Sequence, residues 1–310
     1  MTNNATTIVI GSRGSPLALW QANYLKTALT QSHVSLSVSI KIIKTKGDII
    51  FDQALSKIGD KGLFTKEIET ALLEGDIDLA VHSHKDLPTV SPEGLIIGAI
   101  PQRANAADVL ITKKATSLND LAKNTIILTG SLRRSAQIKH LRPDITTEDI
   151  RGNIQTRLQK FEASNAGAFM MAAAAVDRLN LSHLKAIQLD PHTFIPACAQ
   201  GALAIQIRIN DDHVAQLIAP LNHKETEITV TAERAFLHYL AGGCQTPMGA
   251  YCHYKDGQLA LIGMIASLDG KQFISQQING SDKDPKALGI LLAKALLAKG
   301  GGAIVASLQK

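Results

Sequence analysis

The chain has 310 residues, of which 45% are hydrophobic and 4% aromatic, and its 32 basic and 27 acidic residues give a formal net charge of +5. This length is enough for two or three domains with their own cores and excludes a small binding module. The basic residues are not gathered into runs with interleaved aromatic residues, so small anionic ligands fit the composition better than nucleic acid.

The cysteines and the first residues bear on cellular location. Cys198, Cys244 and Cys252 are an odd number without Cys-x-x-Cys spacing, which favours a reducing compartment over a disulfide framework or a zinc cage. Residues 1–7 contain neither a basic region nor an apolar run, and no stretch approaches eighteen uninterrupted apolar residues. We therefore expect a cytoplasmic protein that does not span a membrane.

The first hundred residues alternate between strand and helix patterns. A strand is predicted over 7–10, and a helix follows it because Ser15 is a good N-cap and Pro16 a good first-turn residue. Further strands are predicted over 38–43, 77–83 and 95–100, with a helix about 68–72 that Gly75 closes. This alternation predicts parallel strand pairing.

The same pattern begins again at Asp108. Strands are predicted over 109–112 and 126–129, a capping-box pattern spans 117–120, and a helix opens after Ser131. The strand 203–209 and helix 213–221 are expected to cross back and complete the first domain, because they resume the strand-to-helix pattern after Pro196. Two crossings of this kind would form a hinge.

The last ninety residues follow a different pattern. A helix is predicted over 225–240, and the turn signals 255–257 and 268–270 divide the next part into a three-stranded antiparallel meander. A helix over 285–298 has one apolar face that would cover the meander. The predicted fold is α/β, with two doubly wound, periplasmic-binding-protein-like lobes and a smaller α+β domain. The expected domain boundaries are 1–101 with 202–221, then 106–197, then 223–310.

Two arginine clusters follow strand-to-helix turns. Arg133 and Arg134 come shortly after the apolar strand, and Arg151 and Arg157 bracket the turn Gly152-Asn153. Arginine binds carboxylates and phosphates in a bidentate way, and a helix start adds free N–H groups. The alternative is that each arginine is a solvated side chain paired with a nearby acid. Two clusters at such turns favour an oxyanion site.

Polar residues also follow several other predicted strands. Ligands bind at the carboxyl ends of strands in doubly wound sheets, where we place Arg13, Asp48, Ser83, Lys85, Asp86, Thr129, Ser131 and Arg151. Asp48 would either pair with a neighbouring cation or stabilise a cationic intermediate. From spacing alone, the ion pair is favoured.

Three other features allow more than one interpretation. His82 and His84 would point the same way from a strand, but no third ligand has suitable spacing, so no metal is expected. The loop 59–64 lacks the Gly-Lys-Ser/Thr ending of a phosphate-binding loop and could be a mobile lid. Cys198 and Cys252 are expected to be buried and inert, whereas Cys244, directly after two glycines, is equally compatible with covalent chemistry.

Eight segments together resemble one family, the porphobilinogen deaminases, also called hydroxymethylbilane synthases. The resemblance covers nearly the whole chain, in order and with matching gaps. The segments are GSRGSPLALWQA from Gly11, KGDII from Lys46, GDKGLFTKE from Gly59, AVHSHKDLP from Ala80, GSLRR from Gly130, RGNIQTRL from Arg151, AQGAL from Ala199 and GGCQTPMGAY from Gly242.

The resemblance implies a three-domain, monomeric transferase of tetrapyrrole (haem) biosynthesis. Such an enzyme joins four porphobilinogen molecules head to tail, releases ammonia at each step and hydrolyses the chain to hydroxymethylbilane. It also implies one covalently bound dipyrromethane cofactor per chain, attached to Cys244 through a thioether. The cofactor and the growing chain carry many carboxylates, which would explain the arginines.

Residue roles are implied by the same motifs. Asp48 matches the catalytic aspartate, and the lid residues are Lys57, Lys61 and Phe64. The residues implied to bind the cofactor, besides Cys244, are Ser83, Lys85, Asp86, Thr129, Ser131, Arg133, Arg134, Gly152 and Arg157. The residues implied to bind substrate are Arg13, Ser15, Gln21, Arg151, Arg178 and Gln200.

Several positions depart from the family pattern. His84 stands where methionine is common, 104–107 replaces a more charged stretch, Gly130 replaces serine, Gly167 replaces aspartate and Ala199 replaces glycine. No implied cation, catalytic aspartate or anchoring cysteine is lost, so we expect activity, with rate and stability open to change. A non-catalytic two-lobed protein that binds anions or other solutes is the alternative from another class.

Overall fold

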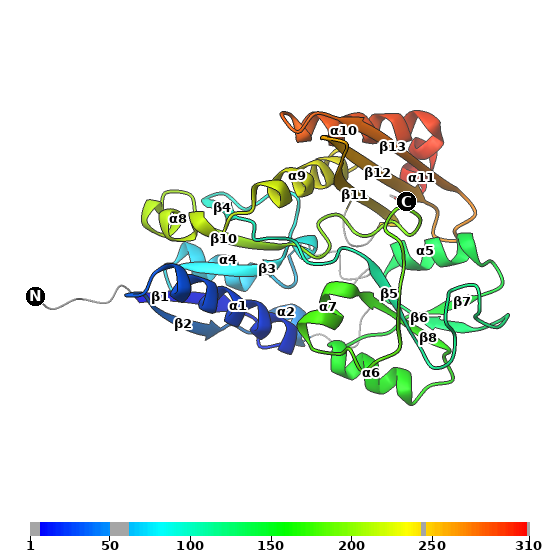
Figure 1. Ribbon diagram of the computed structural model, residues 1–310, viewed down its shortest axis with the longest axis horizontal. Coiled ribbons are helices and arrows are strands. Elements are labelled where there is room, and N and C mark those ends of the chain that lie inside the picture. The colour runs from blue at the N-terminus through cyan, green and yellow to red at the C-terminus, as the bar shows by residue number, and fades with distance from the viewer. Residues whose placement is uncertain (1–6, 50–61, 243–245, 309–310) are drawn as a thin grey trace, which may run out of the picture. The chain divides into compact units, whose positions relative to one another are not determined.

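The computed structural model describes residues 7–49, 62–242 and 246–308. Within these residues the strands form three sheets, two of five strands and one of three. By compactness the chain divides into unit 1, Met1–Arg103 with Ala202–Glu227, and unit 2, Ala104–Gly201 with Ile228–Lys310. Figure 1 shows the course of the chain through both units. The finer division into three domains stays a prediction.

Unit 1 is built on the sheet β2-β1-β3-β10-β4. Its strands are β1 (Thr7–Ser12), β2 (Ser37–Ile42), β3 (Leu79–Ser83), β4 (Leu95–Ala99) and β10 (Leu203–Arg208), and its helices are α1 (Pro16–Ser32), α2 (Lys46–Ile49), α4 (Lys66–Leu73), η1 (His84–Asp86), α8 (Asp212–Ile218) and η2 (Ala219–Leu221). The expected return of the chain is confirmed, because β10 lies between β3 and β4.

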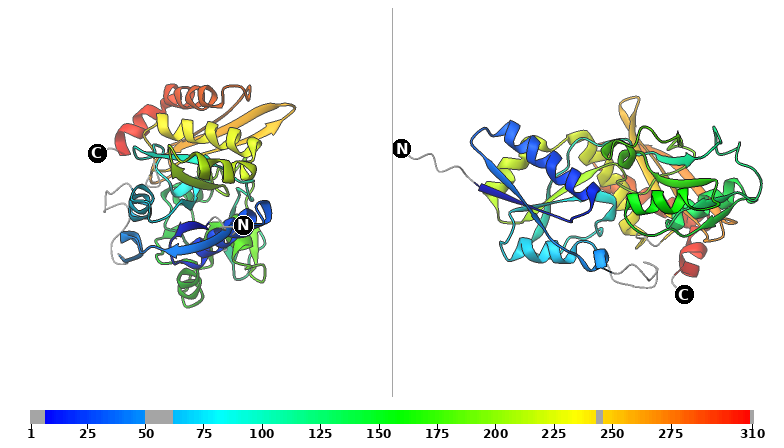
Figure 2. Two further views of the ribbon diagram at one scale, coloured as in Figure 1. Left: turned by 90° about the vertical axis from the view of Figure 1, so that its left-hand side faces the viewer. Right: turned by 90° about the horizontal axis from the view of Figure 1, so that it is seen from below.

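Helices cover both faces of this sheet, and successive residues of β1 pack alternately against one face and the other. Ile8 and Ile10 of β1 belong to the core that contains α1 and α8 residues, whereas Val9 packs with the core under α4. Successive side chains of a strand point to opposite faces, so one apolar strand serves two cores. The right-hand view of Figure 2 shows α1 and α4 on opposite sides of these strands.

Unit 2 contains a second five-stranded sheet, in the order β7-β6-β8-β5-β9. The strands are β5 (Asp108–Thr112), β6 (Ile126–Leu128), β7 (Thr146–Glu148), β8 (Ala168–Ala172) and β9 (Ala186–Gln188), and the helices are α5 (Leu132–Leu141), α6 (Ile154–Glu162) and α7 (Ala173–Arg178). Ile138 of α5 belongs to the core with Ile127 and Met170, while Phe161 of α6 packs near Phe169.

The predicted parallel pairing holds for part of each sheet. β1 is parallel to β2 and β3, and β6 is parallel to β7 and β8. β10 and β5 run antiparallel to their neighbours. Both antiparallel strands come directly after the chain crosses from one unit to the other, so they do not enter through a strand-helix-strand connection.

The three-stranded meander also belongs to unit 2. It consists of β11 (Met248–Lys255), β12 (Gln258–Ala266) and β13 (Phe273–Gly280), all antiparallel. The helices of this part are α9 (Lys224–Tyr239), which enters unit 2 at Ile228, α10 (Pro285–Leu296), η3 (Leu297–Gly301) and α11 (Gly302–Leu308). One sheet face packs on Phe236 of α9 and Leu292 of α10, and Met264 on the other packs near Ala136 of α5.

Of two local helix predictions, one needs correction and one is confirmed. No helix follows the capping-box pattern at 117–120; the Ser117 hydroxyl accepts from the Asp120 N–H at 3.2 Å within a turn. The helix predicted over 285–298 is confirmed: α10 (Pro285–Leu296) passes directly into the π-helix η3 (Leu297–Gly301), and the chain kinks only at Gly300, where φ is 104°.

The helical segment Pro285–Leu308 is long and apolar enough, by length and composition alone, to cross a membrane, and its mean hydropathy reaches 1.7 over eighteen residues. Leu288, Leu292 and Leu296 lie in the core beneath the meander. This burial accounts for part of the apolar character of the segment, whereas Leu291 on the same helix is exposed.

Candidate functional site

Three predicted site residues of unit 1, Ser15, Gln21 and Ser83, lie near the start of α1. The Ser15 hydroxyl accepts a hydrogen bond from the Ala18 N–H at 3.3 Å and begins the helix. Gln21, one turn further on, is buried and donates through Nε2 to the Ser83 hydroxyl at the end of β3, at 2.7 Å. The helix N-terminus and the end of the strand are therefore joined at the same edge of the sheet.

Arg13 and Asp48 form an ion pair beside Phe64. Nε of Arg13 lies 3.1 Å and 3.2 Å from the two carboxylate oxygens of Asp48, and Nη2 also contacts the carboxylate. The Phe64 ring lies 4.2 Å from the Arg13 guanidinium carbon, a cation–π contact. The ion pair that spacing favoured for Asp48 is present.

The surroundings of Asp48 keep it ionised. Burial raises the pKa of this carboxyl, but hydrogen bonds from Arg13 and Thr45 and the charge of Arg13 outweigh burial, so the pKa lies below its ordinary value. The Thr45 hydroxyl donates to Oδ2 at 2.8 Å and its N–H at 3.3 Å. Asp48 is therefore a fixed negative charge at neutral pH.

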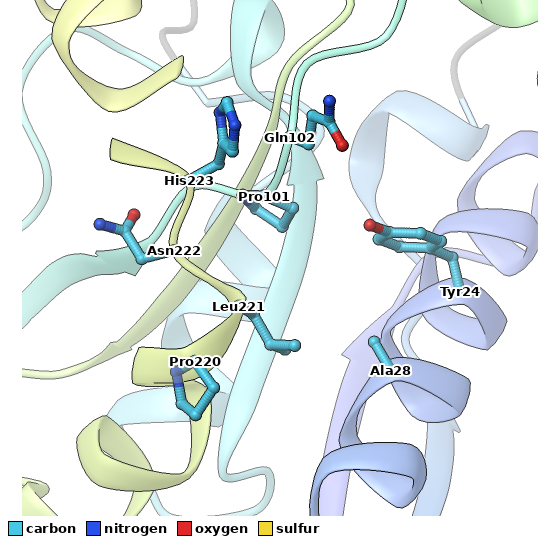
Figure 3. Close-up of a pocket in the computed structure, with 8 residues that line it drawn as sticks. All are labelled: Tyr24, Ala28, Pro101, Gln102, Pro220, Leu221, Asn222 and His223. Carbon is cyan, nitrogen blue, oxygen red and sulfur yellow. The ribbon is translucent and has the colours of Figure 1, made fainter. Parts of the chain in front are cut away.

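A small hollow of about 80 Å³ lies at this edge of unit 1. Six predicted site residues line it, namely Arg13, Ser15, Gln21, Phe64, Ser83 and Asp86. A larger hollow of about 260 Å³, shown in Figure 3, lies between Tyr24 of α1 and the segments at Pro101 and Leu221. None of the predicted site residues lines the larger hollow, so volume alone would have pointed away from the arginine-bearing edge.

In unit 2 the two arginines of α5 surround a buried acid. Nη1 of Arg133 donates to Oδ2 of Asp108 at 2.7 Å, and Nε and Nη2 of Arg134 donate to Oδ1 at 2.9 Å and 2.6 Å. All three side chains are buried. Burial raises the pKa of Asp108, but the two guanidinium charges outweigh it and hold the pKa far below its ordinary value.

Sequence reasoning did not identify Asp108 as this partner. The available signal was an acid at the start of a strand whose other residues are mostly apolar, since such an acid is buried and needs a compensating charge. Gln200 joins the same group, because its Nε2 donates to Oδ1 of Asp108 at 2.9 Å and to the Ala106 carbonyl at 2.8 Å.

The turns before α5 and α6 are capped as predicted. Ser131 accepts from the Arg134 N–H at 3.4 Å, and the Thr129 hydroxyl accepts from the Ser131 N–H at 3.3 Å. Asn153 accepts from the Thr156 N–H at 2.9 Å. These hydrogen bonds fix the first turns of α5 and α6, at which the two arginine clusters lie.

The second arginine cluster is held by local contacts. Arg151 donates to Oδ2 of Asp149 at 2.7 Å, and Arg157 donates to the Gly152 carbonyl at 2.7 Å. Gly152 has a φ of 114°, which favours glycine. Arg178, at the end of α7, donates to the Gly201 carbonyl at 2.7 Å.

The remaining predicted residues are distributed as follows. Lys85 and Asp86 lie in η1, directly after β3. Lys57, Lys61 and Cys244 lie outside the described residues, so the lid and the anchoring thiol stay predictions. Cys198 and Cys252 are buried free thiols, which confirms their expected burial.

The two histidines do not form a pair on one strand. The His82 side chain contacts Gln206, with Nε2 of His82 at 3.0 Å from Oε1 of Gln206. His84 is a buried residue of η1. Among the described residues, no three His, Cys, Asp or Glu side chains are grouped to hold a metal ion.

The fold and these residues define a class of α/β protein that has arginines at the starts of helices and a fixed carboxylate at one strand-end hollow. A family model for the porphobilinogen deaminase dipyromethane cofactor binding domain matches residues 8–216, and one for the porphobilinogen deaminase C-terminal domain matches residues 227–298. These matches include every residue of the two arginine clusters.

Curated relatives carry the same name. A porphobilinogen deaminase of Chlorobium phaeovibrioides is 45% identical over 307 residues, with 98% of each chain covered. One of Moorella thermoacetica is 48% identical over 298 residues, covering 96% of this chain and 95% of the relative. The chain belongs to the porphobilinogen deaminase family. It is a transferase of tetrapyrrole biosynthesis, and its cofactor is dipyrromethane.

Solved structures with a related arrangement are more distant. An ancestral cationic amino acid solute-binding protein is 14% identical, with a TM-score of 0.45, covering 71% of this chain and 89% of that chain. A probable amino-acid transporter extracellular-binding protein of Bacillus subtilis is 12% identical, with a TM-score of 0.42, covering 70% and 90%. The predicted α/β class with a small three-stranded domain is confirmed by the sheets themselves, and the non-catalytic alternative is not favoured.

Proposed function

We propose that Asp48 is the catalytic carboxylate of the four-step condensation of porphobilinogen and that the arginines receive the carboxylates of cofactor and substrate. The observation that supports this assignment is the fixation of Asp48 by Arg13 and Thr45 next to a strand-end hollow. A carboxylate with a lowered pKa is a weak proton acceptor but a permanent negative charge.

The charge of Asp48 matches the chemistry of the first step. Loss of ammonia from the aminomethyl group of porphobilinogen leaves a cation on the substrate, and a nearby carboxylate lowers the energy of that cation. At about 4 Å and an effective dielectric constant of about 20, the attraction is about 4 kcal/mol, or on the order of a thousandfold in rate.

Arg13 is suited to hold Asp48 and substrate at once. Its Nε and Nη2 bind Asp48, and no described residue accepts from Nη1. We assign Nη1 to a substrate carboxylate, because guanidinium groups bind carboxylates in a planar, directional way. The other residues assigned to substrate are Ser15, Gln21, Arg151 and Arg178.

The residues of unit 2 fit a cofactor that carries carboxylates. Arg133, Arg134 and Asp108 together bear one net positive charge, and Nε of Arg133 is buried without a hydrogen-bond partner among the described residues. A buried donor of this kind favours an acceptor from a ligand. When bound, dipyrromethane supplies the pyrrole ring to which substrate is joined, and we assign its thioether to Cys244.

Within this group the side chains have different tasks. Arg134 and Gln200 donate hydrogen bonds to Asp108 and to backbone carbonyls. We therefore assign both residues the role of positioning Asp108, which in turn positions Arg133. The other residues assigned to the cofactor are Ser83, Lys85, Asp86, Thr129, Ser131, Gly152 and Arg157.

We further infer that the protein acts as a cytoplasmic monomer on a small anionic substrate, without nucleic acid or membrane. Support comes from the modest net charge of +5 and the two buried free thiols. Light scattering of the purified protein tests the monomeric state, since a single chain has a mass of 33.1 kDa.

Replacement of Asp48 by Asn tests the assignment. We expect kcat to fall by about a thousandfold, because the amide keeps the size of the side chain but removes the charge that stabilises the cation. Ammonia release from porphobilinogen, measured under saturating substrate, gives kcat directly.

Two controls separate chemistry from assembly. Intact mass and peptide mapping should show two pyrrole units on Cys244 in both the wild type and Asp48→Asn. Asp76→Asn removes the charge of an exposed acid paired with Lys41 in the same unit and should leave kcat unchanged. A near-normal kcat in Asp48→Asn would refute the catalytic assignment, and an unmodified Cys244 would refute the anchoring assignment.

A further inference from the structure

Two imidazoles meet at the surface of unit 2. His192 follows β9 and has an exposed side chain, and His253 lies on β11, the edge strand of the meander. Their rings are nearly perpendicular, at 88°, with centroids 4.7 Å apart. Tyr251, on the same face of β11, stacks on His253.

The distance between the two Nε2 atoms matches that between two ligands of one metal ion. Nε2 of His192 lies 3.4 Å from Nε2 of His253. N–H···O hydrogen bonds span about 2.7–3.2 Å, so this contact between two ring nitrogens is at most a long hydrogen bond. Two imidazole nitrogens on one tetrahedral zinc ion, each about 2.0–2.1 Å from the metal, lie about 3.3–3.4 Å apart.

Asp190 orients the first imidazole for such a role. Its Oδ1 accepts from Nδ1 of His192 at 2.9 Å and from the His192 backbone N–H at 3.0 Å. We therefore assign the proton of His192 to Nδ1, which leaves the lone pair of Nε2 available at the nitrogen that lies next to His253. A carboxylate behind a histidine is the usual way in which a ligating imidazole is held.

We propose that His192 and His253 bind one divalent transition-metal ion of the Zn²⁺ type, with water completing its coordination. The described residues provide no third His, Cys, Asp or Glu side chain for a closed cage, so the site is open and its affinity is expected to be micromolar. The ion would connect the chain segment after β9 to the edge of the meander, both within unit 2.

Calorimetric titration of the holoenzyme with ZnCl₂, in a buffer that does not chelate metals, tests the proposal. We expect one site that is lost, or at least tenfold weaker, in both His192→Gln and His253→Gln. Asp190→Asn should weaken the same site by about 10–100-fold without changing the two ligands. Zn²⁺ should also raise the thermal midpoint of the wild type and not that of the two histidine variants.

His183→Gln is the matched control, since His183 is also an exposed histidine of unit 2. It should bind Zn²⁺ as the wild type does, and metal bound by cofactor carboxylates or other groups should be common to all variants. Circular dichroism verifies that each variant is folded. Equal Zn²⁺ affinity in the wild type and both histidine variants, or no binding to any of them, would overturn the proposal.

Discussion

Asp108 is fully buried, and its charge is compensated by Arg133 and Arg134. Such a pair is tolerated because each charge has hydrogen-bonding partners, and removal of one partner would leave an uncompensated charge in the interior. The sequence offered two interpretations of these arginines, ligand binding and pairing with an acid. At this site pairing is present, and the donor left over on Arg133 is what supports ligand binding.

Two alanines have left-handed backbone conformations. φ is 49° at Ala241, which is exposed after α9, and 62° at Ala199, which is fully buried. We expect Ala241→Gly to raise the free energy of unfolding by about 0.5–1 kcal/mol, because glycine relieves the left-handed strain of about 1–2 kcal/mol at some cost in unfolded-chain entropy. Urea unfolding measures the change.

Ala199→Gly is the companion variant. It relieves the same strain but removes a buried methyl group worth about 0.8 kcal/mol, so its net effect should be smaller than that of Ala241→Gly. A lower free energy of unfolding for Ala241→Gly than for the wild type would contradict the role of backbone strain.

The short elements that carry the site depend on close backbone approaches. Gly47 lies in α2 next to Asp48, and its N–H donates to the Leu63 carbonyl at 2.8 Å. A Cβ at this position would lie 2.2 Å from the Phe64 ring and 2.9 Å from that carbonyl. The absence of a side chain at Gly47 therefore lets Phe64 cover Arg13.

Gly47→Ala should disturb the site through this element. We expect kcat/KM to fall by about tenfold, because Phe64 must leave its cation–π contact with Arg13, which is worth about 0.5–2 kcal/mol. Steady-state kinetics with porphobilinogen measure the effect. Gly75→Ala is the control: its φ of 79° strains the backbone of any other residue, but its Cβ would meet nothing within 4 Å, so it should lower stability and leave kcat/KM unchanged. Equal kcat/KM in both variants would contradict the prediction.

Local signals predicted some elements well and missed others. The turn Asp256-Gly257 has positive φ at both residues, 51° and 77°, as expected for a tight hairpin between β11 and β12. β8 was missed because all five of its residues are buried and apolar, so its sequence has no alternation. The pattern at 117–120 has its capping bond but no helix, since no apolar helical face follows it.

At the scale of the whole molecule, His82 links stability to pH. Burial lowers its pKa to about 4, although the hydrogen bond that His82 Nε2 donates to Oε1 of Gln206 opposes this, and the charge of Arg13 adds to the lowering. The unfolded chain, with a histidine pKa of about 6.5, then takes up the proton more readily. Above pH about 6.5, His82 is neutral in both states and the free energy of unfolding is at its full value. It decreases as the pH falls toward 4, because the unfolded chain takes up the proton.

The free energy of unfolding should therefore fall by about 2 kcal/mol between pH 7 and pH 5 because of this one histidine. His82→Gln should lack that part of the decrease, and His183→Gln, at an exposed position, should retain it. Denaturant unfolding at the two pH values gives the comparison. An equal decrease in the wild type and His82→Gln would show that His82 is not the group responsible.

The sequence by itself determined the α/β class, the return of β10 to the first sheet, the meander and the family, because periodicity, turn residues and motifs are local properties of the chain. Only the tertiary structure decided that Asp108 pairs with two predicted anion-binding arginines, that Asp48 is held by Arg13 and Thr45, and that β5 and β10 run antiparallel. Each of these depends on which segments meet after folding, and burial then decides which charges are paired.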